Sequence, residues 1–113
     1  MKKALIICIT LCLFGSTARA DGMLMVGPGA TTCETYNSEV QRSNARATAY
    51  LAWAHGYMSA INARNTQTNT SVDLSSSLDT RAQNQFLHGY CAGNPDKWFV
   101  FGVMELMDLL AKT

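Results

Sequence analysis

Two cysteines, Cys33 and Cys91, constrain the fold of this chain most, because they are the pair that follows a segment typical of an export signal. Residues 1–20 have a short basic start, an apolar run of about a dozen residues and a small-residue end, Ala18-Arg19-Ala20, where a signal peptidase would cut. The apolar run is too short for a permanent membrane-spanning helix. We therefore expect a mature protein exported to an oxidising compartment, which is the periplasm if the source is a Gram-negative bacterium.

In that compartment one intramolecular pairing is available, a Cys33–Cys91 disulfide. Such a bridge closes a long loop, and the chain-entropy model assigns it about 4 kcal/mol of stabilisation. Two free buried thiols and an intermolecular bridge are the alternatives. Cys8 and Cys12 leave with the signal, and Leu11 argues against a lipid anchor at Cys12 because a small residue is needed there.

The mature length suits one domain with a modest core. We expect a single helical domain at 33–113, preceded by an extended, flexible lead-in at 21–32 that glycine and proline residues mark. Outside the signal, six basic residues stand against eight acidic ones, and they form no basic patch. This charge pattern argues against nucleic acid as a partner. No second apolar stretch reaches membrane-spanning length, so no membrane anchor is expected.

Helical periodicity is the regular pattern of the mature chain. Through residues 38–64, bulky side chains recur at steps of three and four: Tyr50, Trp53, Tyr57 and Ile61. A parallel row of small residues on the same segment would let another backbone approach closely. We expect this helix to be buried on several sides and to form the centre of the fold.

Two further helices are predicted after a mobile loop at 65–77 that is rich in Asn, Thr and Ser. Ser77 can cap the first of them, which should end near residues 91–92. Asn94-Pro95-Asp96 predicts the start of the last helix, with Asn94 as the cap and Pro95 at the first helical position.

The fold class that follows is all-α. We expect a small orthogonal helical bundle of three main helices, with a fourth short helix as an option at residues 32–37. The Cys33–Cys91 disulfide would tie the start of the central helix region to the end of the second helix. Because the third helix follows directly, one seam would then fix all three.

One constellation invites a catalytic interpretation. His55, Ser59 and Asn62 share a helix face, but a hydrolytic site needs a base that meets the nucleophile and a third group that orients the base. Side chains one turn apart rarely achieve this, so a polar seam, facing solvent or bonded to the lead-in, is the preferred interpretation. His55 and His88 are too few for a zinc site, and a pH-sensitive contact suits them better. We expect no enzyme activity, no metal and no cofactor.

Aromatic side chains cluster in two of the predicted helices, and their first role is in the core. A domain this small can leave some of them for a partner surface. The candidate partner-binding residues are Trp53, Tyr57, Trp98 and Phe101.

Several segments together resemble a family of exported bacterial helical proteins. Residues 32–36, Thr-Cys-Glu-Thr-Tyr, are similar to the Cys-Glu-x-aromatic opening of the periplasmic acid-stress chaperones HdeA and HdeB. Residues 56–62 resemble the glycine-aromatic segment of their central helix, and Cys91 sits where their second cysteine precedes the last helix. Residues 85–110 also resemble the Tai-type immunity proteins of type VI secretion.

The resemblance implies a disulfide-linked helical fold without an active site. It also implies a homodimer at neutral pH and binding of unfolded client proteins on acidification. This sequence departs from those chaperones in being charge-poor and in lacking their lysine-rich last helix, and from the immunity proteins in lacking their additional cysteines. We expect a stress chaperone that binds clients through apolar helix faces; the alternatives are an immunity protein that neutralises a secreted toxin and a structural protein of the envelope.

Overall fold

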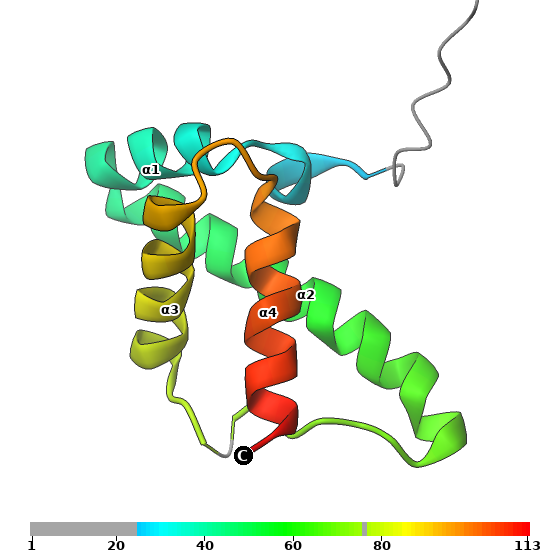
Figure 1. Ribbon diagram of the computed structural model, residues 1–113. Helices are drawn as coiled ribbons and strands as arrows, with labels where there is room; N and C mark the ends of the chain where they lie inside the picture. The colour runs from blue at the N-terminus through cyan, green and yellow to red at the C-terminus, as the bar shows by residue number, and fades with distance from the viewer. Residues whose placement is uncertain (1–24, 76) are drawn as a thin grey trace, which may run out of the picture.

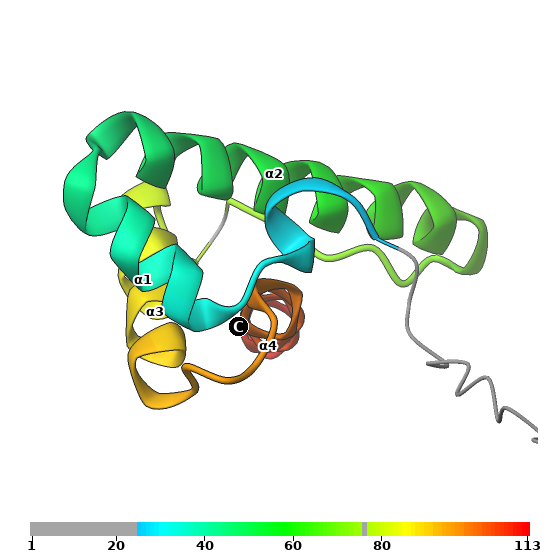
Figure 2. The same ribbon diagram turned by 90° about the horizontal axis from the view of Figure 1, so that it is seen from above.

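The computed structural model describes residues 25–75 and 77–113, and these contain four α-helices and no strand. They are α1 (Cys33–Arg42), α2 (Asn44–Asn65), α3 (Thr80–Gly93) and α4 (Phe99–Ala111) (Figure 1). Figure 2 shows α4 end-on while α2 runs across the view, so these two helices cross steeply. The all-α class and the Cys33–Cys91 disulfide are confirmed. The predicted signal at 1–20, with its cysteines, lies outside the described residues.

The single long helix expected at 38–64 is two helices. Ser43 is extended, with φ −157° and ψ 123°, and it separates α1 from α2. The optional short helix at 32–37 is the first part of α1, which has 10 residues and begins after Thr32, whose Oγ1 accepts a hydrogen bond from the Thr35 amide. The break at Ser43 lets α1 pack on the core in a direction of its own.

The small-residue row of α2 does not meet another backbone, contrary to expectation. All of its members are exposed: Ala45, Ala49, Ala52, Gly56 and Ala60. The core face of α2 is instead formed by larger buried side chains such as Tyr50 and Met58. The more deeply buried helix is α4, which turns Phe99, Val103 and Leu106 inward.

The boundaries of α3 and α4 also differ from the prediction. Asp79, not Ser77, caps α3, because its carboxylate accepts a hydrogen bond of 2.8 Å from the Ala82 amide. Asn94 closes α3 rather than opening α4, since its Nδ2 donates to the Tyr90 carbonyl over 2.8 Å. In the turn after Asn94, the carbonyls of Pro95 and Lys97 accept hydrogen bonds from the first amides of α1. This turn does not start a helix, and α4 begins at Phe99.

The described part of the lead-in is extended at Val26, Thr31 and Thr32 but not between them. Gly27–Ala30 forms a 3₁₀ helix that packs on α2 and α4. Gly27 has φ +77°, and a Cβ on Gly29 would overlap the Trp53 ring, so glycine is required at both positions.

The core centres on Phe99, the first residue of α4. Its ring stacks on Tyr36 of α1 at a centroid distance of 4.8 Å and meets Tyr50 of α2 edge-on at 4.9 Å. Because these three rings come from three helices, they hold α1, α2 and α4 together at one point.

Candidate functional site

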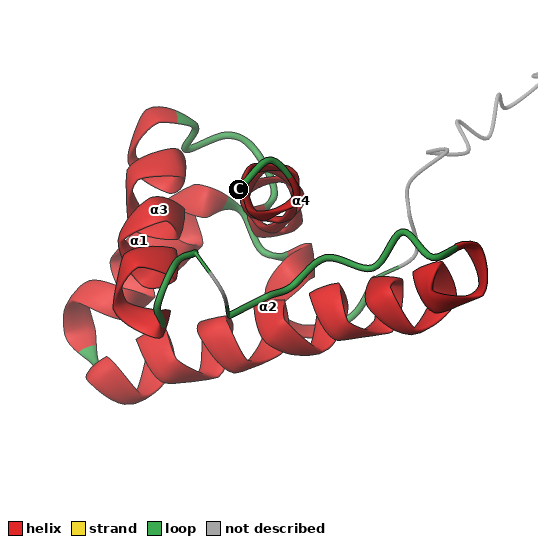
Figure 3. Cartoon of the chain, turned by 90° about the horizontal axis from the view of Figure 1, so that it is seen from below, coloured by secondary structure: helices red, strands yellow, loops and turns green. Residues whose placement is uncertain are grey.

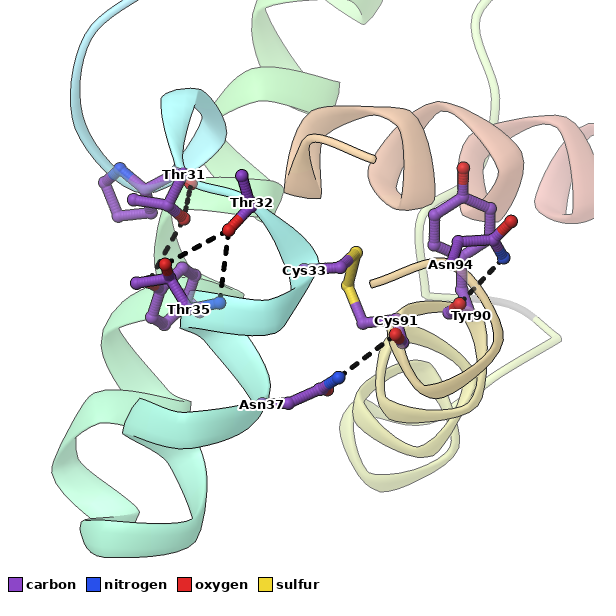
Figure 4. Close-up of a disulfide and its surroundings, with 10 residues drawn as sticks. Thr31, Thr32, Cys33, Thr35, Asn37, Tyr90, Cys91 and Asn94 are labelled. Atoms are coloured by element: carbon purple, nitrogen blue, oxygen red, sulfur yellow. Dashed lines mark hydrogen bonds between the residues drawn. A yellow bond between two sulfur atoms is a disulfide. The ribbon is translucent and has the colours of Figure 1, made fainter. Parts of the chain in front are cut away.

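The disulfide lies in a seam that joins the start of α1 to the end of α3 (Figure 4). Cys33 and Cys91 are fully buried, and the Asn37 side chain donates to the Cys91 carbonyl over 3.0 Å. The amides of Cys33 and Glu34 donate to the carbonyls of Lys97 and Pro95, at 2.7 and 2.9 Å. The covalent bridge thus joins α1 to α3, and the hydrogen bonds fix the turn before α4 to the start of α1.

The four predicted partner-binding aromatics fall into two pairs. Trp53 stacks on Tyr57 within α2, with ring centroids 5.4 Å apart, and both are half-buried. Trp98 and Phe101 are 38% and 40% exposed at the start of α4. Between residues 25 and 113, outside residue 76, no ring contact joins the two pairs. Trp53 packs against Gly27 and Gly29 of the 3₁₀ helix, so part of its ring is covered.

A residue that the sequence reasoning missed completes the exposed part of α4. Met104 is 40% exposed and follows Phe101 by three positions, so both lie on the outer side of this helix. We call Trp98, Phe101 and Met104 the α4 surface. The sequence between residues 98 and 104 is almost continuously apolar, so periodicity could not separate its inner side chains from its outer ones.

Two residues of the predicted polar seam, His55 and Asn62, form hydrogen bonds, but not to the lead-in. His55 Nε2 lies 2.8 Å from Gln83 Oε1 of α3, and Gln83 is only 2% exposed. Both protons of the Gln83 amide go to carbonyls of the connection between α2 and α3, so its oxygen accepts and His55 Nε2 carries the proton. This bond commits His55 to Gln83 rather than to Ser59, and Asn62 bonds the connection instead of orienting His55.

Ionisable groups in the core have a structural role. Burial raises the pKa of Tyr36 to about 12, with the neighbouring Tyr50 as a smaller cause. Burial also raises the pKa of Tyr50, whose hydroxyl donates to Glu39 over 2.7 Å. His88, the other histidine, is exposed and lies beside the Tyr36 ring, with centroids 5.4 Å apart.

Two further observations bear on the kind of site this chain carries. In the part of the chain that the structure describes, no group of three or more His, Cys, Asp or Glu residues is arranged to hold a metal ion. None of the helices described has both the length and the apolar character needed to cross a bilayer.

The apolar α4 surface borders a groove. A hollow of about 330 Å³ separates the second half of α2 from α4 and is lined by Ile61, Met104 and Met107 among others. Comparison with family models, with curated proteins and with solved structures returned no match.

Proposed function

We propose that this protein is an exported, non-enzymatic protein-binding protein, a stress chaperone that holds unfolded clients through the α4 surface. One observation carries the proposal: Phe101 and Met104 of α4 and Trp98, the residue that precedes this helix, are each about 40% exposed. Large apolar side chains gathered on a surface are typical of a protein-interaction site. Their exposure in a chain whose core is otherwise well buried favours a binding role over a purely structural one.

The surroundings of the α4 surface support this role. The seam around the disulfide fixes the start of α4, so Trp98 and Phe101 are presented on a firm support. The disulfide also suits a protein that works in the periplasm, where thiols are oxidised.

Acid is the trigger that would expose more of the apolar surface. At pH 2 to 3 the carboxylates of a protein are largely protonated, while arginine, lysine and histidine stay charged. The self-repulsion that results loosens a small domain.

Light scattering from an acid-sensitive client tests the proposal at pH 2 to 4 and at pH 7. The wild-type protein should suppress client aggregation in acid, and the double variant Phe101→Ser/Met104→Ser should lose most of that suppression. Val26→Ser is the matched control, because Val26 is 85% exposed but lies away from the α4 surface in sequence and outside the helices.

Two results would overturn the proposal. One is the absence of suppression by the wild-type protein at a stoichiometric ratio. The other is equal suppression by the wild-type protein and the double variant. A tight complex with one folded toxin at pH 7, without suppression of aggregation, would favour an immunity protein instead.

A further inference from the structure

The connection between α2 and α3 lies against the helices rather than standing away from them. Its residues 70–75, which we call the strap, run back along α2 toward α3 (Figure 3). Val72 and Leu74 are half-buried against the core, whereas Ser71, Asp73 and Ser75 are exposed. This alternation is that of an extended chain with one face bound.

Side-chain amides bind the backbone of the strap. Asn62 Nδ2 donates to the Val72 carbonyl over 2.7 Å, and its Oδ1 accepts from the Val72 amide over 2.9 Å. Gln83 Nε2 donates to the Leu74 carbonyl over 2.7 Å. These contacts involve groups that every polypeptide carries, so they do not depend on the sequence of the strap.

The seat of the strap, which is the surface of the helices that it covers, includes two hollows that the strap does not fill. On one side, a hollow of about 370 Å³ lies among His55, Ser59, Leu74 and neighbouring residues. On the other side, the hollow of about 330 Å³ lies between Val72 and α4. The second hollow is also lined by Met104, so the seat of the strap is continuous with the α4 surface.

We infer that the strap is a self-ligand in a groove that accepts an extended peptide with apolar side chains at alternate positions. Backbone hydrogen bonds would supply affinity, and the two hollows would accept larger side chains than those of the strap. The inference rests on the proposed function for the source of such peptides, which are segments of unfolded clients. Opening of the strap would free the whole groove, which already reaches the α4 surface at Met104.

Peptide binding to a strap-weakened variant tests the inference. Val72→Ser/Leu74→Ser removes the apolar anchors of the strap and leaves Asn62 and Gln83 in place. The probe is a fluorescein-labelled peptide of residues 69–79, and its control is a scrambled peptide that lacks the alternation. If the wild-type strap is open about 10% of the time or less, weakening it should tighten peptide binding at least about tenfold in fluorescence anisotropy. Asn62→Ala in the same background should reverse most of that gain.

Several outcomes would overturn the inference. They are equal binding by the wild-type protein and the folded variant, equal binding of the scrambled peptide, and no effect of Asn62→Ala. A variant that dimerises instead of binding the peptide would assign the groove to a second copy. Should the variant fail to fold, hydrogen exchange of the wild-type protein decides: the Val72 amide must exchange well before the Val103 amide, and equal rates would refute a separable strap.

Failure of this inference is distinguishable from failure of the proposed function. Loss of client suppression in Phe101→Ser/Met104→Ser concerns the α4 surface alone. Suppression by the wild-type protein without peptide binding by the strap-weakened variant would leave the proposed function standing and refute the groove.

Discussion

Tyr36→Phe isolates the energetic cost of one buried hydroxyl. Tyr36 is 1% exposed, and among the described residues its Oη has no hydrogen-bond partner. A buried polar group without a partner costs about 1–3 kcal/mol, so its removal should raise the free energy of unfolding by about 1 kcal/mol at pH 7. The ring contacts with Phe99 and Tyr50 remain available to phenylalanine.

The same variant should change the response to alkali. The pKa of Tyr36 is raised from 10.0 to about 12 in the folded protein, so the unfolded chain loses this proton first as the pH rises. The stability due to the shift is fully present below pH 10 and falls by about 1.4 kcal/mol per pH unit up to about pH 12, a loss on the order of 3 kcal/mol. Tyr36→Phe should lack this loss, and its stability advantage should grow across that interval.

Urea unfolding followed by circular dichroism between pH 7 and 12 measures both effects. Tyr50→Phe is the matched control, because the Tyr50 hydroxyl donates to the Glu39 carboxylate and its removal should lower stability by about 1–3 kcal/mol. A loss of stability in Tyr36→Phe at pH 7, or pH profiles that run parallel to the wild type, would refute the reasoning.

Three further tests address the disulfide, the packing and the strap. Reduction of the Cys33–Cys91 bridge should lower the unfolding free energy by about 4 kcal/mol in urea titrations, and an unchanged midpoint would contradict its role in the fold. Gly29→Ala should lower the free energy of unfolding by about 1–3 kcal/mol because the new methyl group meets the Trp53 ring. Gly56→Ala has open space at its Cβ and should be neutral or stabilising. Equal effects of the two variants would be inconsistent with that packing. Asn62→Ala removes the two hydrogen bonds between the Asn62 side chain and Val72, and it should speed hydrogen exchange of the strap amides at least tenfold. Unchanged exchange would show that other contacts hold the strap.

The sequence was sufficient for the all-α class and the cysteine pairing. Helical periodicity and turn residues are local signals, and the pairing followed from a count of cysteines. The break at Ser43 was not predicted because it involves neither Gly nor Pro, and it depends on how α1 and α2 each meet the core. The Asn94-Pro95 motif predicted the wrong start for the last helix, because Asn94 caps the end of α3 instead.

Two of the four residues predicted to bind a partner, Trp98 and Phe101, belong to the α4 surface, and their binding role stays a prediction. Trp98 and Phe101 are exposed as a partner surface requires, but Trp53 was taken from the same aromatic pattern and lies under the 3₁₀ helix. The strap was expected to be a mobile loop because its composition is polar. Its attachment depends on Asn62 and Gln83, whose amides find their partners only once the helices are assembled.

Site-specific photocrosslinking to a defined acid-denatured client tests the central claim most directly. A photoreactive residue at position 101 should crosslink to the client at pH 2 to 4, whereas the same residue at exposed position 64 on α2 should not. Crosslinks confined to position 101 would support binding of unfolded chains by the α4 surface. Equal crosslinking at the two positions, or none at position 101, would contradict it.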